Sequence, residues 1–153
     1  MKTVTKSDIA ALSVSKEGTY IAGGDEDGIV HIWDVRKPTE HLLQIQRDLY
    51  PITSMCSIHT EKQDLIAVGS QNGSLYTING FGFGFADSRD RGNESYENSG
   101  SSKLTGIKTD TEFVGFGSGA INGIKCLYGG HRNLLNDYTL HVTAGCDGSI
   151  YKI

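Results

Sequence analysis

Three cysteines and five histidines are the side chains whose types could supply redox, metal-binding or nucleophilic chemistry in this chain. Cys56, Cys126 and Cys146 could form a redox pair, or a metal site together with His131. No Cys-x-x-Cys or His-x-x-x-His spacing supports a metal site. Because all three cysteines lie in β-like runs, the sequence favours small side chains buried or half-buried among strands.

The histidines are scattered along the chain. His31 and His141 lie in predicted strands, His41 opens another, and His59 and His131 lie in predicted connections. No base or nucleophile stands at an identifiable position beside any of them, so Ser-His-Asp or Cys-His catalysis has no anchor. The sequence therefore predicts no enzyme, no catalytic residue, no cofactor and no metal.

An acidic run, Asp25-Glu26-Asp27, could suggest calcium, but nothing completes a ligand loop at the required offsets. Since Asp27-Gly28 suits a two-residue hairpin turn, we expect a structural role for Asp27. Asp25 and Glu26 are expected to be solvated.

The motif Gly80-Phe81-Gly82-Phe83-Gly84-Phe85 has the glycine density of a phosphate-binding loop. It lacks the Gly-Lys-Ser/Thr sequence, and no helix follows whose N-terminus would hold phosphate. In an extended strand, Phe81, Phe83 and Phe85 would share one side. They would either cap the core or form an exposed anchor for a partner protein.

Composition excludes some classes of function. Net charge is −4, and no basic stripe is present, so a direct nucleic-acid partner is not expected. The N-terminus has no apolar segment typical of a signal peptide, and no run is long enough to span a bilayer. With an odd number of cysteines, this predicts an intracellular protein, nuclear or cytoplasmic, without membrane insertion.

The elements that position these residues form a threefold repeat. Each unit has three β-like runs with an Asp/Asn-Gly turn before the last, at Asp27-Gly28, Asn72-Gly73 and Asp147-Gly148. The predicted runs are 9–14, 19–24 and 29–35, then 52–58, 65–70 and 74–78, then 121–127, 139–146 and 149–153, with a fourth strand at 41–45. A repeated unit must stack on copies of itself to bury its apolar face.

Residues 80–118 separate the second and third units and are rich in Gly, Ser, Asn and charge. We expect an insertion, partly flexible because its middle has few apolar groups. A short strand at 111–116 is predicted within it, and a degenerate blade is the less favoured alternative. The predicted units are then 4–46, 50–79 and 119–153.

The segment Ile21-Ala22-Gly23-Gly24-Asp25-Glu26-Asp27-Gly28-Ile29-Val30-His31-Ile32-Trp33-Asp34 resembles the signature of WD-repeat β-propellers, and Cys146-Asp147-Gly148-Ser149-Ile150-Tyr151 is a weaker copy. The resemblance implies blades of four antiparallel strands. Of the four residues of the family's usual hydrogen-bonded network, Asp27 and Trp33 match in the first unit, and Thr143 and Asp147 in the third. Asn72 and Ile78 replace two of them in the second. The resemblance thus implies a divergent member held mainly by sheet packing.

The fold class expected is all-β, a partial propeller of about three blades that forms the C-terminal part of a larger one. Other blades would come from another segment, another subunit or a second copy of the chain. A good signature is followed by Trp33-Asp34-Val35-Arg36-Lys37-Pro38 and His41-Leu42-Leu43, then by a poorer blade, a long Ser-rich insertion and a short last blade. This order of features is similar to the end of the small WD-repeat nucleoporin of the Y-shaped outer-ring complex. The resemblance implies a scaffold for protein partners in a multi-subunit assembly. The alternatives are a propeller-type enzyme or a modified-peptide receptor that uses the central channel.

Overall fold

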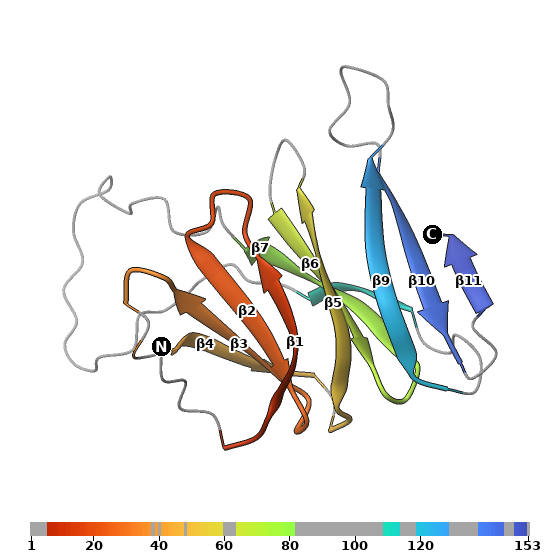
Figure 1. The fold of residues 1–153 in the computed structure, drawn as a ribbon, viewed down its shortest axis with the longest axis horizontal. Coiled ribbons are helices and arrows are strands. Elements are labelled where there is room, and N and C mark those ends of the chain that lie inside the picture. Colours follow the sequence, from red (N-terminus) through yellow and green to blue (C-terminus); the bar gives the residue numbers. More distant parts are fainter. Residues whose placement is uncertain are drawn as a thin grey trace, which may run out of the picture.

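The computed structural model describes residues 6–37, 39, 41–47, 49–59, 64–81, 109–113, 119–128, 138–145 and 149–152. The regular structure of these residues is entirely β-strand, in three antiparallel sheets that stand side by side (Figure 1). The expected all-β fold and partial propeller are confirmed. The described residues include no helix that could cross a membrane.

The first sheet contains four strands hydrogen-bonded in chain order: β1 (Ile9–Val14), β2 (Tyr20–Asp25), β3 (Ile29–Asp34) and β4 (His41–Gln46). Each strand lies within a residue of its prediction. Gly28 has φ of 79° at the β2–β3 turn, a left-handed conformation that glycine adopts without steric cost.

The second sheet contains β5 (Ile52–His59), β6 (Asp64–Ser70), β7 (Leu75–Phe81) and β8 (Thr109–Phe113), again in chain order. β8 falls inside the segment expected to be an insertion between units, and it pairs with β7, with Thr111 opposite Thr77. The long connection therefore joins the third and fourth strands of one sheet. We expected the second unit to end at residue 79, with residues 80–118 outside it. This boundary is wrong for β8, which is the outer strand of the second sheet.

The third sheet contains β9 (Ile121–Tyr128), β10 (Tyr138–Ala144) and β11 (Ser149–Lys152), in the order β11-β10-β9. Among the described residues it has three strands where four were expected. His59, predicted in a connection, is instead the last residue of β5.

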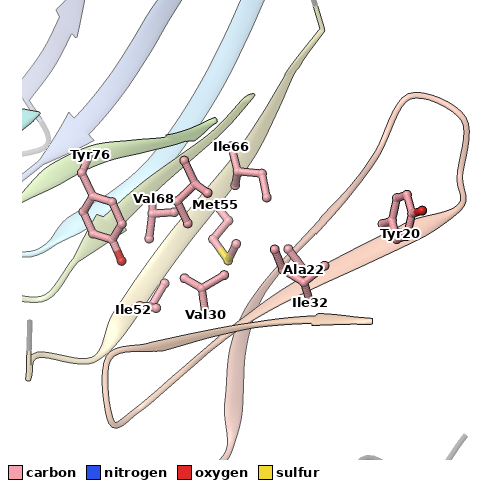
Figure 2. Close-up of a cluster of buried hydrophobic side chains, with 10 residues drawn as sticks. Tyr20, Ala22, Val30, Ile32, Ile52, Met55, Ile66, Val68 and Tyr76 are labelled. Carbon is pink, nitrogen blue, oxygen red and sulfur yellow. The ribbon is translucent and has the colours of Figure 1, made fainter. Parts of the chain in front are cut away.

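Two apolar cores lie between the sheets. Figure 2 shows the first core, where Ala22, Val30 and Ile32 of the first sheet meet Ile52, Met55, Ile66, Val68 and Tyr76 of the second. The second core joins the second and third sheets; its members are Ile58, Leu65, Ala67, Leu75, Ile121, Ile124, Leu140 and Val142. The middle sheet thus buries both faces, which explains why all of β6 is buried.

We call the face of each sheet directed toward the next sheet in the chain its forward face, and the opposite face its backward face. The forward face of the first sheet includes Ala22, Val30 and Ile32. The backward face of the third sheet includes Ile124 and Val142. Because side chains alternate along a strand, neighbouring residues belong to opposite faces.

The sheets approach most closely where an isoleucine of one sits over a glycine of the preceding one. A Cβ on Gly24 would lie 2.4 Å from Ile52 Cγ2, and a Cβ on Gly69 would lie 2.6 Å from Ile121 Cγ2. Only glycine fits at this distance. We call each such pair a glycine seat, and the two seats, Gly24–Ile52 and Gly69–Ile121, fix how each sheet sits on the previous one.

Candidate interaction surfaces

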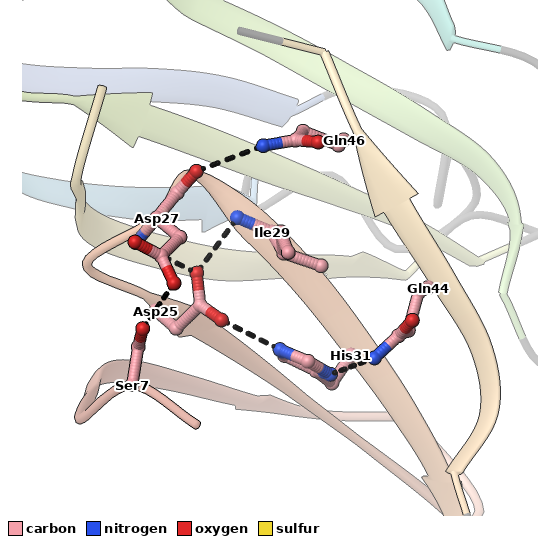
Figure 3. Close-up of polar contacts among 7 residues, drawn as sticks. All are labelled: Ser7, Asp25, Asp27, Ile29, His31, Gln44 and Gln46. Carbon is pink, nitrogen blue, oxygen red and sulfur yellow. Dashed lines mark hydrogen bonds and ion pairs between the residues drawn. The ribbon is translucent and has the colours of Figure 1, made fainter. Parts of the chain in front are cut away.

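The β2–β3 hairpin is organised by a buried carboxylate. Asp25 Oδ1 accepts hydrogen bonds from the backbone N–H groups of Asp27 (3.0 Å) and Ile29 (2.8 Å). Its Oδ2 lies 2.7 Å from His31 Nε2, and His31 Nδ1 lies 3.2 Å from the Gln44 amide nitrogen (Figure 3). Asp25 therefore ties the turn to strands β2 and β3, and His31 extends the network to β4.

This arrangement corrects one expectation. Asp25 is only 2% exposed, so its predicted solvation is wrong, whereas Glu26 and Asp27 are exposed. Asp27 contributes to the turn at its surface, where its carboxylate accepts a hydrogen bond from the Ser7 hydroxyl and its carbonyl accepts one from Gln46 Nε2 at 3.0 Å. The sequence thus missed the structural role of Asp25, whereas the structural role expected for Asp27 stays a prediction.

Histidine partners were also missed. His31 contacts Asp25, and His59 Nδ1 lies 3.2 Å from Asp64 Oδ1. The Asp25–His31 pair has the shape of a catalytic dyad, but both side chains are 3% exposed. Because the second ring nitrogen of His31 faces Gln44, the pair has no accessible nucleophile, and its geometry serves the hairpin.

Trp33 lies close to this network. It is 3% exposed, and its ring stacks on His31 with centroids 5.6 Å apart and planes at 18°. Gly23 makes room for it, since a Cβ there would lie 2.9 Å from Trp33 Cζ3. The structure thus brings Trp33 together with His31 and Asp25, while Asp27 stays at the turn surface.

The second hairpin turn is held by different hydrogen bonds from the first. Asn72 Oδ1 accepts a hydrogen bond from the Ser74 N–H at 3.0 Å and another from the Ser70 hydroxyl. Gly73 has φ of 84°, as its turn position requires. Asn72 and Gly73 therefore hold this turn locally, without the buried carboxylate of the first hairpin.

The third hairpin has a longer connection. Thr143 pairs with Gly123 of β9 and Ile150 of β11. It therefore occupies the register position in its sheet that Gly24 and Gly69 occupy in theirs. Thr143 Oγ1 donates a hydrogen bond to the Gly123 carbonyl at 3.3 Å. The other two predicted residues of this hairpin, Asp147 and Gly148, lie outside the described residues.

The aromatic motif is only partly visible. Phe81 is the last residue of β7, with its backbone opposite Asp64 of β6. Phe83 and Phe85 lie outside the described residues. The proposed partner contact of these phenylalanines stays a prediction.

An ion pair at the end of β3 joins the exposed Arg36 to Asp34, the buried last residue of the strand. Arg36 donates to Asp34 through both Nε and Nη2, at 2.9 and 2.6 Å. These hydrogen bonds lower the pKa of the Asp34 carboxyl to about 2. Burial, and then the nearby Asp34 charge, raise the pKa of Tyr20.

Cys56 in β5 and Cys126 in β9 lie at the second core, half-buried. Burial raises the pKa of the Cys56 thiol, which disfavours the reactive thiolate. Cys146 and His131 lie outside the described residues. The described His, Cys, Asp and Glu side chains form no group of three that could hold a metal ion.

Each end sheet leaves part of its outer face exposed; on the first sheet this part is in β1, whereas His31 and Trp33 of β3 on the same face are buried. On the backward face of the first sheet, Leu12 is 63% exposed and Val14 47% exposed. An open hollow of about 600 Å³ lies at β9. Its lining consists of Ser54 of β5, Ile124 of the backward face of the third sheet, and Gly123, Lys125, Leu127, His141 and Thr143 of the forward face. These two regions are candidate interaction surfaces.

Comparison with known proteins agrees with this geometry. The family model "WD domain, G-beta repeat" matches residues 2–34. Among solved structures, "Structure of U3-55K" is similar with a TM-score of 0.55 and 15% identity, covering 97% of this chain and 37% of that one. "Crystal structure of RRP9 WD40 repeats" is similar with a TM-score of 0.53 and 14% identity, covering 95% of this chain and 36% of that one.

No match was found among curated proteins. The chain spans little more than a third of the length of the two structural neighbours. At such low identity the neighbours establish the fold alone. Residues 2–34 are thus a WD40 repeat, and the chain as a whole has the fold of a divergent WD-repeat β-propeller segment.

Proposed function

We propose that this chain is a non-enzymatic WD-repeat scaffold that holds protein partners in a larger multi-subunit assembly. The observation that carries the proposal is the exposed β1 part of the backward face of the first sheet. Leu12 and Val14 pair with Gly23 and Ile21 on the backward face of the first sheet. The backward faces of the second and third sheets carry the pairs Met55–Val68 and Ile124–Val142. Met55 and Ile124 are buried by a preceding sheet, whereas Leu12 and Val14 are exposed.

An exposed apolar face of this kind marks an interaction site. The covering element would be a further propeller blade, from another chain segment, another subunit or a second copy. The polar groups of the described hairpins support the same role, since Asp25, His31 and Asn72 serve turns and leave no convergent catalytic group. Neither a propeller-type enzyme nor a modified-peptide receptor has a specific observation in its favour.

The type of assembly is a finer proposal. Membership of a nuclear pore outer ring, and a location at the nucleus, cytoplasm or nuclear envelope, rest on the order of sequence features alone. A fluorescent fusion of the protein tests them: a nuclear-rim pattern supports the pore, and a diffuse signal contradicts it.

Affinity purification from cells followed by mass spectrometry tests the scaffold. We expect a stable set of proteins with the wild type, and loss of part of this set with Leu12→Glu. Leu49→Glu is the matched control, because Leu49 is 80% exposed and lies outside the face. A monomer without partners, or equal recovery with all three proteins, would contradict the proposal.

A further inference from the structure

We call the contact between two neighbouring sheets a seam, and each seam brings together one side chain from each of their first strands. At the first seam these residues are Ser13 of β1 and Ser57 of β5, whose hydroxyl groups form a hydrogen bond with each other. Ser13 lies on the forward face of the first sheet, opposite Ala22, and Ser57 lies on the backward face of the second, opposite Ile66. Side chains at these two positions therefore meet across a seam.

Two cysteines hold the equivalent positions at the second seam. Ser13 and Cys56 each lie two residues after the residue that pairs with the seat glycine, in β1 and β5. Ser57 and Cys126 each lie three residues after the residue that pairs with the seat position, in β5 and β9. Cys56 thus lies on the forward face of the second sheet and Cys126 on the backward face of the third, as the two serines do at the first seam.

The glycine seat of the second seam brings the two cysteines to the same level. A Cβ on Gly69 would lie 3.2 Å from Ile124 Cδ1, so Ile124 lies over Gly69 and its pairing partner Ser54. Strands β5 and β9 are neighbours that run in the same direction (Figure 1), and two residues further along them are Cys56 and Cys126. Facing sheets usually lie about 10 Å apart, too far for a disulfide, but the close approach at Gly69 narrows this seam.

The surroundings of the two thiols agree with this placement. The Cys126 backbone lies within hydrogen-bonding reach of the Cys56 sulfur. Both residues are half-buried thiols packed against the second core. Burial raises the pKa of Cys56, whereas the hydrogen bond from the Cys126 backbone and the charge of Lys125 lower it. The net rise keeps Cys56 mainly in its thiol form, so the pair stays reduced until an oxidant reacts with it.

We propose that Cys56 and Cys126 are a redox-sensitive clasp, which a peroxide closes as a disulfide between the second and third sheets. One thiolate attacks a peroxide oxygen, the O–O bond breaks, and the sulfur becomes a sulfenic acid. The second thiolate attacks that sulfur, the S–S bond forms, and hydroxide leaves and takes up a proton to become water. With hydrogen peroxide, two thiols are thus oxidised to one disulfide and one peroxide is reduced to two waters.

The closed clasp would join two residues that are 70 positions apart in the chain. A crosslink over such a distance stabilises a fold mainly by restricting its unfolded chain. The third sheet would be held more firmly on the second, and a thiol reductant would release it. Disulfides of intracellular proteins are usually transient and often sense oxidants. This regulation goes beyond the scaffold role proposed above and does not depend on it.

Oxidation of the full chain with hydrogen peroxide, followed by trypsin digestion without reductant and mass spectrometry, tests the clasp. Trypsin cleaves after Lys and Arg, so Cys56, Cys126 and Cys146 fall on separate peptides, 48–62, 126–132 and 133–152. In the folded chain we expect 48–62 to be joined to 126–132 about tenfold more than either is joined to 133–152, because only facing thiols meet the geometry of a disulfide. The urea-unfolded chain, oxidised in the same way, should give all three pairings.

Closure should also raise the urea midpoint of the chain by about 1 M, and dithiothreitol should reverse the rise. Cys146→Ser is the matched control, because it keeps the pair and should respond like the wild type. Cys56→Ser and Cys126→Ser should show no rise, and circular dichroism checks that each variant is folded.

Four outcomes would overturn the proposal. Peroxide could leave both thiols unchanged, or convert them only to sulfinic or sulfonic acids; the peptides 48–62 and 126–132 could be joined mainly to 133–152; or the joined and reduced chains could have the same urea midpoint. The peptide map needs the wild type alone, so it decides the question even if a serine variant does not fold.

Discussion

Asp25 and His31 form a buried pair whose oxygen–nitrogen distance is 2.7 Å, and Asp25 also accepts two backbone hydrogen bonds from the turn that separates them. Asp25 thus contacts both the turn and β3 of the first sheet. Its neighbour in sequence, Asp27, reaches only the surface of the same turn.

Asp25→Ala should therefore destabilise the chain far more than Asp27→Ala. Removing a carboxylate that satisfies buried donors costs about 2–4 kcal/mol, whereas a change at an exposed turn carboxylate costs about 0.5 kcal/mol. Urea unfolding of both variants measures the difference. Equal losses would mean that the surface carboxylate organises the hairpin, as the sequence suggested.

Gly24→Ala and Gly69→Ala should each destabilise the packing of two sheets. The added Cβ would overlap with Ile52 or Ile121, and overpacking of this kind costs about 1–3 kcal/mol. Gly123→Ala is the control in an inner strand, since its Cβ would meet only the Thr143 hydroxyl, at 3.0 Å. If all three changes have the same effect on the urea midpoint, strand propensity and not inter-sheet contact is responsible.

The Asp34–Arg36 pair should make stability depend on pH at the acid end. The pKa of Asp34 is lowered from 3.8 to about 2, so its stabilisation is present above 3.8 and is lost as pH falls through about 2. Arg36→Gln should remove this dependence. The difference in urea midpoint between wild type and variant should therefore shrink toward zero in this range, and a difference that stays constant would contradict the assignment.

Cys56 should react slowly with alkylating reagents near neutral pH. Burial raises the pKa of its thiol, which lowers the thiolate fraction. Mass spectrometry after brief iodoacetamide treatment can follow Cys56 alone, with the urea-unfolded chain as reference. A rate equal to that of the unfolded chain would show that the second core is open at this point.

Most of the fold was predictable because alternation and turn chemistry are local. The predicted bounds of the inner strands differ by at most one residue from the observed ones; these predictions were 9–14, 52–58 and 121–127. The Asn72-Gly73 turn was also predicted in its observed place. The partner of β8 was not predictable. Its five residues follow a long connection, and nothing in their pattern specifies which strand edge they join.

The Asp25 network and the residues on the forward face of the third sheet could not be predicted from the sequence, for a different reason. The sequence Asp25-Glu26-Asp27-Gly28 offers two aspartates near one turn, and only the bend of the backbone decides which one turns inward. Alignment on Asp147-Gly148 sets Ala144 against Gly24, whereas the hydrogen-bonded register sets Thr143 there. The one-residue difference thus concealed which residues of β10 share the face of Gly24 and Gly69, because a shift by one residue moves a side chain to the other face.

The isoleucine-over-glycine contacts also give the array a direction. Ile52 and Ile121 project from one side of their sheets, and Gly24 and Gly69 receive them on the other. Two copies related by a twofold axis would bring identical surfaces together and could not form such a contact. Any further sheet that uses the same contact must therefore be added head-to-tail. In the third sheet Thr143 holds the position of the receiving glycine, so this contact cannot be repeated there.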